Sequence, residues 1–179
     1  MKRLIILIII LTHISCRGND TPLNIIKRHI GETIIFDHTC LVYHYKDKTY
    51  LTFNELRSKF DYLSVVYIDE TCSACRATLI EWFDQQNVIE DIQNNYSYGV
   101  LFIYRGDNMI NYIKTNLGMN NVFPYYIMNY QEMTFLLDNK LDQQVISSSF
   151  VIDKDNKICI IGEPFATKKL HQLYIDMFN

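Results

Sequence analysis

The sequence predicts an α/β fold in which a mixed β-sheet is flanked by helices on both faces. In the middle of the chain, short apolar runs typical of buried strands alternate with segments of helical spacing. Two strand-turn-strand patterns stand on either side of this region. Alternating strands and helices form parallel pairs, whereas hairpins add antiparallel ones, so the sheet is expected to be mixed.

Length and composition indicate a single globular domain. The chain has 179 residues, of which 49% are hydrophobic and 21% are charged, which suffices for one buried core. With only 3 prolines and 6 glycines, it shows no flexible linker and no repeat. The net charge is -3 and lysine and arginine are not clustered, so nucleic acid is not expected as a partner.

Residues 1–15 are predicted to be a signal peptide. Lys2 and Arg3 precede a continuous apolar run over residues 4–11, which is too short to cross a bilayer as a helix. The run ends at Ile14-Ser15-Cys16 and resembles a bacterial lipoprotein signal. That resemblance implies a lipid on Cys16 that attaches the exported chain to a membrane, with plain secretion as the alternative. Residues 16–32 are then expected to be a tether, and residues 33–179 the folded domain.

The folded domain is expected to open with a hairpin and a short helix. Residues 33–45 are rich in β-branched and aromatic side chains, residues 46–48 supply a polar turn, and an apolar pattern resumes at residue 50. Thr52 and Glu55 have the spacing of a capping box. A helix is therefore predicted over about residues 53–60.

The central elements follow as two buried strands and their helices. Residues 63–68 are continuously apolar, as in a strand buried on both faces. A helix is predicted from Cys72 to about Asn94, because Leu79, Trp82 and Ile89 recur at roughly helical spacing. Further elements are expected at residues 100–104 (strand), 107–117 (helix) and 125–128 (strand).

The last third predicts a second hairpin and a closing helix. Residues 150–152 and 158–161 are apolar and are joined by a polar turn at residues 153–157. Residues 168–178 have the pattern of an amphipathic helix.

Cys72 and Cys75 carry the strongest chemical signal in the sequence. Two residues separate them, and they fall where a buried strand gives way to a helix. At the helix N-terminus the dipole and the free backbone N–H groups favour a thiolate at Cys72, which makes it the expected nucleophile. Cys75 lies inside the first turn, is expected to be less exposed, and would attack Cys72 to resolve a mixed disulfide.

Two other interpretations of this cysteine pair remain open. The first is a passive structural disulfide. The second is half of a zinc site, which is the weaker, because no second ligand pair with similar spacing is visible.

These residues resemble a known family. Val65-Val66-Tyr67-Ile68, Cys72-Ser73-Ala74-Cys75 and the closing segment over residues 150–158 are similar to thioredoxin-like extracytoplasmic thiol-disulfide oxidoreductases, of the lipoprotein and cytochrome-c-maturation type. The resemblance covers about residues 33–179. It implies a thioredoxin fold with an N-terminal hairpin and a central insertion.

The resemblance also implies an activity and its partners. The expected reaction is disulfide exchange through Cys72 and Cys75 with the thiols or disulfides of exported proteins. It needs no bound cofactor, and it requires a redox donor that the sequence does not identify.

Three positions depart from the family pattern. Thr71 stands where thioredoxins usually carry tryptophan, and Val66 stands where they carry a buried acid. Ser148 stands at the position of the cis-proline that faces the disulfide and orients the substrate, so Ser148 is expected in the substrate loop. These departures keep a second hypothesis open, in which a non-catalytic accessory lipoprotein binds partners and retains the disulfide as a brace.

A weaker pattern concerns His38, Cys40 and His44. Their even spacing would place them on one face of a regular strand, as in a metal site. Scattered strand residues, with Cys40 acting as a small hydrophobe, are the favoured interpretation, so no metal is predicted.

Overall fold

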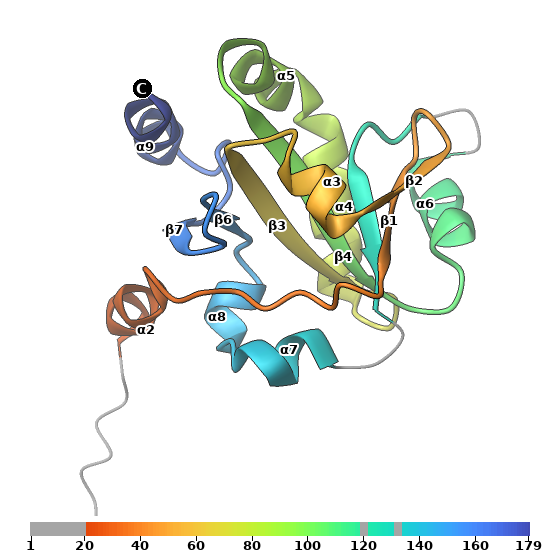
Figure 1. Ribbon diagram of the computed structural model, residues 1–179, viewed down its shortest axis with the longest axis horizontal. Coiled ribbons are helices and arrows are strands. Elements are labelled where there is room, and N and C mark those ends of the chain that lie inside the picture. The colour runs from red at the N-terminus through yellow and green to blue at the C-terminus, as the bar shows by residue number, and fades with distance from the viewer. Residues whose placement is uncertain (1–20, 119–121, 131–133) are drawn as a thin grey trace, which may run out of the picture.

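The computed structural model describes residues 21–118, 122–130 and 134–179. In these residues one seven-stranded sheet has the order β2-β1-β5-β4-β3-β6-β7 (Figure 1). The strands are β1 (Leu41–His44), β2 (Thr49–Thr52), β3 (Tyr62–Asp69), β4 (Tyr98–Arg105), β5 (Tyr126–Asn129), β6 (Phe150–Ile152) and β7 (Ile158–Ile161). The described helices are α2 (Pro22–His29), α3 (Phe53–Arg57), α4 (Ser73–Asp84), α5 (Gln86–Asn95), α6 (Met109–Leu117), α7 (Thr134–Asn139), α8 (Gln143–Ile146) and α9 (Lys168–Phe178).

The centre of the sheet is parallel and its flanks are antiparallel. Strand β4 runs parallel to both β3 and β5, whereas β1 and β6 pair antiparallel on the two sides of this trio. The carboxyl ends of β3, β4 and β5 therefore meet at one edge of the sheet. Asp69 pairs with Arg105 there, and Tyr104 pairs with Asn129.

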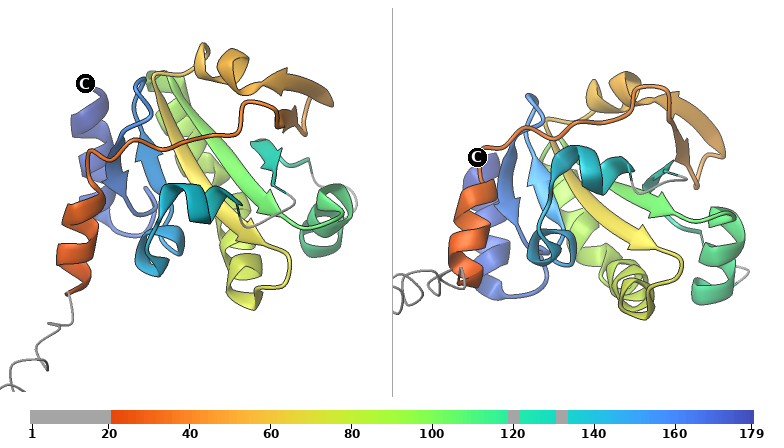
Figure 2. Two further views of the ribbon diagram at one scale, coloured as in Figure 1. Left: turned by 60° about the horizontal axis from the view of Figure 1, so that its bottom comes forward. Right: turned by 90° about the horizontal axis from the view of Figure 1, so that it is seen from below.

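Helices cover both faces of the sheet, as the sequence predicts. Alternate residues of β3 point to opposite faces, so Val65 and Tyr67 join one apolar cluster while Val66 and Ile68 join the other. The first cluster contains buried side chains of α2, α3, α7 and α8, and the second contains those of α4, α5, α6 and α9. Figure 2 shows the sheet between α7 and α8 on one side and α4 and α6 on the other. The predicted mixed sheet flanked by helices is confirmed.

The N-terminal part of the domain differs from the expected tether. Residues 22–29 form α2, which starts with Thr21 as N-cap and Pro22 in its first turn. Ile25 and His29 are buried, and α2 packs against α8. The predicted signal peptide and Cys16 lie outside the described residues.

The first hairpin is shorter than predicted. Strand β1 begins at Leu41, because residues 31–34 instead cover the outer edge of β7. The Gly31 N–H donates to the Ile158 carbonyl at 2.7 Å, and the Ile158 N–H donates to the Glu32 carbonyl at 2.9 Å. This pairing satisfies backbone groups that an open sheet edge would leave free. The capping box of Thr52 and Glu55 is present at the start of α3 as predicted.

The predicted helix over residues 72–94 is divided in two at Gln85, where the backbone leaves helical geometry. A straight helix of that length would extend about 33 Å, which exceeds the span of an eight-residue strand, about 27 Å. The bend keeps both halves on the sheet, since Trp82 of α4 and Ile92 of α5 are both buried. The short helices α7 and α8 are a further difference, because the sequence predicted no helix between the strands at residues 125–128 and 150–152.

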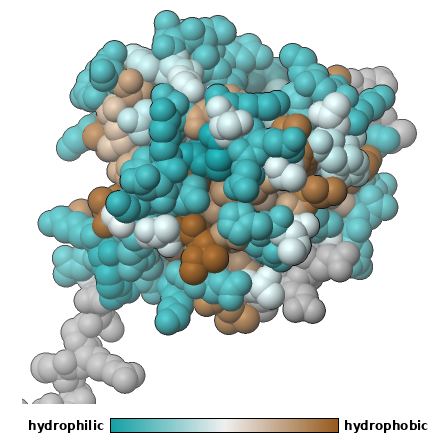
Figure 3. Space-filling view, viewed as in Figure 1, coloured by the Kyte–Doolittle hydropathy of each residue, from teal (hydrophilic) through white to brown (hydrophobic). Residues whose placement is uncertain are grey.

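The surface seen in Figure 3 is largely hydrophilic, with apolar side chains in small scattered patches. None of the helices in the described ranges is long and apolar enough to cross a membrane.

Candidate functional site

Cys72 is the N-cap of α4, at the junction of β3 and α4 that the sequence predicted. Its backbone N–H donates to the Asp69 carbonyl at 3.1 Å. Its sulfur accepts a hydrogen bond from the backbone N–H of Cys75 at 3.3 Å. A serine or aspartate side-chain oxygen commonly makes this bond at a helix N-cap. Buried Leu79 and Trp82 hold α4 against the sheet. The first turn of the helix therefore points its free N–H groups at the Cys72 sulfur.

The two cysteines differ in how readily they ionise. Hydrogen bonds from the Cys75 side chain and from the Cys75 backbone N–H hold the pKa of Cys72 below its ordinary value. Burial, and then the same hydrogen bond to Cys72, raises the pKa of Cys75 to about 11. Both are free thiols and both are partly buried. The asymmetry makes Cys72 the sulfur that carries negative charge first.

A cavity of about 280 Å³ opens beside the two cysteines. Its apolar lining comes from β3, α4, α7 and α8, and Tyr67, Asp69 and Gln143 add polar groups. Burial raises the pKa of Tyr67, so its phenol stays protonated and can donate a hydrogen bond. The full lining is Val66, Tyr67, Asp69, Cys72, Ala74, Cys75, Thr78, Leu136, Gln143, Ile146, Ser147 and Ser149.

The serine loop reaches this cavity with a different residue from the one predicted. Ser147 and Ser149 line it, whereas Ser148 is not among the lining residues and its N–H donates to the Val145 carbonyl at 3.3 Å. All peptide bonds of the described residues are trans, so the Ser148 loop is not cis-like. Ser149 takes a left-handed conformation with φ of 51° directly before β6.

Ser149 is therefore the loop residue that sequence reasoning missed. It is only 3% exposed, and its hydroxyl has no hydrogen-bond partner among the described residues. A buried polar group without a partner is costly, and such positions often mark ligand or catalytic sites. The one signal in the sequence was a small polar residue directly before a buried strand.

The acids near the cysteines are already engaged. Val66, at the position of the family's buried acid, lines the cavity and cannot carry a proton. Asp69 also lines it, but hydrogen bonds from Thr71 and Arg105 outweigh burial and hold the pKa of Asp69 below its ordinary value. Glu70 accepts hydrogen bonds from the Tyr104 hydroxyl at 2.7 Å and from the Asp107 N–H at 3.0 Å. Asp69 is therefore a poor proton acceptor at neutral pH, and the Glu70 carboxylate is held by Tyr104 and Asp107.

The other cysteine and histidine candidates do not join this site. His44 pairs with Asp47 at 2.8 Å and stacks on Tyr126, while His38 and Cys40 precede β1. Within the part of the chain that the structure describes, no three metal-binding side chains cluster. Cys159 donates its S–H to the Val151 carbonyl at 3.3 Å, and burial raises its pKa to about 12, so it is a structural thiol.

Comparison with solved structures identifies the fold. A thioredoxin-like protein from Bacteroides caccae matches with a TM-score of 0.53 and 19% identity over 88% of this chain, which spans only 53% of that protein. The thioredoxin domain of a thiol-disulfide oxidoreductase from Bacteroides vulgatus matches with a TM-score of 0.55 and 12% identity, over 84% of this chain and 98% of that one. The chain has a thioredoxin-like fold.

Within thioredoxin-like proteins, the likeness extends beyond the Bacteroides structures. A proposed thiol:disulfide interchange protein, DsbE, from Chlorobium tepidum matches with a TM-score of 0.55 and 11% identity, over 84% of this chain and 98% of that one. No protein-family model and no curated protein sequence matches this chain. A fold does not by itself determine a function, so the chemistry of this site depends on the geometry around Cys72 and Cys75.

Proposed function

We propose that this protein is an exported thiol-disulfide oxidoreductase that exchanges disulfides with exported proteins through Cys72 and Cys75. The observation that supports this most directly is the Cys72 sulfur, which caps α4, borders a cavity and has a lowered pKa. Thiolates attack disulfides whereas thiols do not, so these three properties together are those of a nucleophile.

The reduced pair seen here would act in two steps. The Cys72 thiolate attacks one sulfur of a substrate disulfide, a Cys72–substrate disulfide forms, and the second substrate sulfur leaves as a thiolate. The Cys75 sulfur then attacks Cys72, which releases the first substrate sulfur and leaves a Cys72–Cys75 disulfide. Two electrons pass from the pair to the substrate. In reverse the same steps oxidise a substrate dithiol.

Cys75 must lose its proton before the second step. Once Cys72 is part of the mixed disulfide, it is no longer a thiolate and no longer accepts a hydrogen bond from the Cys75 S–H. The substrate thiolate released in the first step is a base in the same cavity and takes the Cys75 proton. Asp69 is a poorer acceptor, because its hydrogen bonds to Thr71 and Arg105 favour the ionised carboxylate.

A structural brace is the weaker hypothesis for this pair. Cys72 and Cys75 are already fixed relative to one another by the first turn of α4. A disulfide stabilises mainly by restricting the unfolded chain, and this effect is smallest for short loops. A bond across two intervening residues would therefore add little stability.

Export and membrane attachment belong to the same proposal. The signal-peptide pattern of residues 1–15 and the lipoprotein-like Ile14-Ser15-Cys16 motif support a lipid on Cys16. The described domain would then act outside the cytoplasm, where protein disulfides form and persist.

Trapping of substrate proteins tests the activity. In a Cys75→Ser variant of the full-length chain, mixed disulfides between Cys72 and partner proteins should accumulate on non-reducing gels. The matched Cys72→Ser variant should trap none, because the remaining sulfur has a raised pKa. Equal trapping by the two variants, or trapping by neither, would contradict the proposed exchange.

A further inference from the structure

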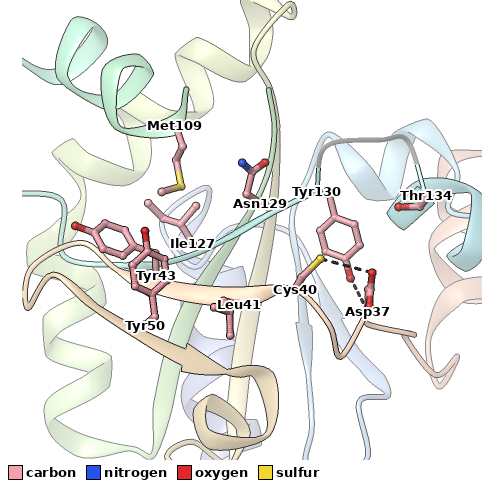
Figure 4. A pocket seen from close by; sticks show the side chains of 10 residues that line it. All are labelled: Asp37, Cys40, Leu41, Tyr43, Tyr50, Met109, Ile127, Asn129, Tyr130 and Thr134. Atoms are coloured by element: carbon pink, nitrogen blue, oxygen red, sulfur yellow. Dashed lines mark hydrogen bonds between the residues drawn. The ribbon is translucent and has the colours of Figure 1, made fainter. Parts of the chain in front are cut away.

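A second and larger hollow lies at the same edge of the sheet as the cysteines. It has a volume of about 560 Å³ and is bounded by the N-terminal hairpin, the start of α6 and the end of β5. Figure 4 shows the rings of Tyr43 and Tyr50 grouped near Met109 and Ile127, with Asn129 between this group and Tyr130. The exchange reaction proposed above does not use these residues.

The charge of this hollow is negative. Asp37 is the only charged side chain among its described lining residues. Hydrogen bonds from the Thr39 hydroxyl and backbone N–H hold the pKa of Asp37 below its ordinary value, so the carboxylate stays ionised. A carboxylate in a hollow without a lining cation favours a positively charged occupant.

The neutral groups of the hollow also suit a cation. The Asn129 side-chain oxygen is buried and accepts no hydrogen bond from the described residues, so it lacks a donor. Tyr43 and Tyr50 lie with ring centroids 4.9 Å apart, and Tyr50 is 64% exposed. Tyrosine ring faces attract ammonium and guanidinium groups. The lining of the hollow therefore combines an anion, a hydrogen-bond acceptor and aromatic rings.

The sheet register places Asn129, in the wall of the hollow, two strands away from the end of β3. Asn129 pairs with Tyr104, and Tyr104 pairs with Ile68, which is close to the end of β3 that leads to Cys72. Two strand spacings amount to about 10 Å. On α7, Thr134 lines the larger hollow and Leu136 lines the cysteine cavity, so the two spaces are neighbours along that helix.

We propose that the larger hollow binds a lysine or arginine side chain of the protein whose cysteine reacts at Cys72. An extended chain advances about 3.3 Å per residue, so the basic residue would stand about three positions from the reacting cysteine. The inference rests on the proposed disulfide exchange and adds a substrate class to it: exported polypeptides that carry a basic residue near a cysteine.

A peptide series tests this proposal. Each peptide carries one cysteine as a mixed disulfide with 5-thio-2-nitrobenzoate, and arginine, glutamine or glutamate three positions away. The reduced full-length chain attacks the disulfide, and release of the coloured thiolate gives the rate. All proteins carry Cys40→Ser, which removes the thiol of the hollow itself. The arginine peptide should react about tenfold faster than the glutamine peptide, and the preference should weaken with added salt.

Two variants test whether the preference for the arginine peptide arises in the larger hollow. Asp37→Asn and, separately, Asn129→Leu should each reduce the arginine preference to less than about threefold, because each removes one partner of the cation. Asp155→Asn is the matched control. It removes the same charge from the β6–β7 turn, which lies beside the start of β3, at the opposite end of the central strands from the hollow. It should leave the preference unchanged.

The outcomes separate this inference from the activity that underlies it. Equal rates for the arginine and glutamine peptides, with thiolate release that still depends on Cys72, would overturn the subsite and leave the exchange reaction standing. Retention of the preference in both Asp37→Asn and Asn129→Leu would do the same. If the rate were unchanged by Cys72→Ser, both proposals would fall.

Discussion

Ser149 combines a buried hydroxyl, a left-handed backbone and a place in the wall of the cysteine cavity. The conformation costs a non-glycine residue about 1 kcal/mol, and the unpartnered hydroxyl adds a further penalty. Its carbonyl accepts the Gly162 N–H at 3.1 Å, so the strand pairing of β6 and β7 keeps the residue in this conformation. Strained polar residues of this kind persist where a site uses them.

Replacement of this serine should therefore separate stability from activity. Ser149→Gly should raise the free energy of unfolding by about 1 kcal/mol, because glycine adopts positive φ freely and brings no buried hydroxyl. The same variant should slow disulfide exchange. Urea denaturation and the thiolate-release assay measure the two effects. Ser149→Ala is the control, since it removes the hydroxyl but keeps the strain. A Ser149→Gly protein that is less stable than wild type would contradict this explanation.

At this scale the sequence predicted the position of the two cysteines better than the residues around them. The spacing of Cys72 and Cys75 and their position after an apolar run were enough to place them at a strand-helix junction. The choice between Ser148 and Ser149 was not predictable, because no local pattern in the sequence indicates the left-handed conformation of Ser149. Nor did any local pattern indicate that Asp69 of β3 would form an ion pair with Arg105 of the neighbouring strand β4.

Helix α2 extends the folded domain toward the N-terminus beyond the predicted boundary at residue 33. Its buried His29 contacts Glu32 through Nδ1 at 2.5 Å and Asp142 through Nε2 at 2.7 Å. Asp142 immediately precedes α8, and α8 contributes Gln143 and Ile146 to the cysteine cavity. The segment that leads toward Cys16 is therefore packed against one wall of the candidate site.

A pair of substitutions on one helix tests whether α2 is docked. Ile25 is buried and Leu23 is 58% exposed. Ile25→Ala should lower the free energy of local unfolding of α2 by about 2 kcal/mol. Amide hydrogen exchange over residues 22–29 should then be about 30-fold faster. Leu23→Ala should change it by less than about 0.5 kcal/mol. Equal exchange in the two variants would mean that α2 behaves as a free tether.

The sequence predicted the type of most elements and missed those that depend on distant partners. Long apolar runs identified β3 and β4, and capping residues identified α3, because these signals are local. Helices α2, α7 and α8 are short and gain their stability from packing on the rest of the domain. The pairing of residues 31–34 with β7 likewise joins segments more than 120 residues apart.

At the scale of the whole molecule, Glu163 should make stability depend on pH. Burial raises its pKa to about 7, compared with about 4.3 in an unfolded chain. The folded state thus binds a proton that the unfolded state has released, so this contribution is complete below about pH 4 and is lost as pH rises through about 7. Unfolding free energy should fall by roughly 1–3 kcal/mol across that window.

Glu163→Gln provides the comparison, because glutamine has nearly the same shape and does not titrate. Urea denaturation at several pH values should show a flatter dependence between pH about 5 and 8 in this variant. An identical slope in the two proteins would assign the pH dependence to other groups.

The central claim is that Cys72 is an activated nucleophile and Cys75 its shielded partner. The measurement that tests it most directly is the pH dependence of alkylation at each cysteine of the reduced full-length chain, resolved by peptide mass mapping. Cys72 should react first, with a midpoint below the value of about 8.5 for a free thiol, while Cys75 should titrate near about 11. Equal rates at the two sulfurs, or a Cys72 midpoint at or above about 8.5, would contradict the claim.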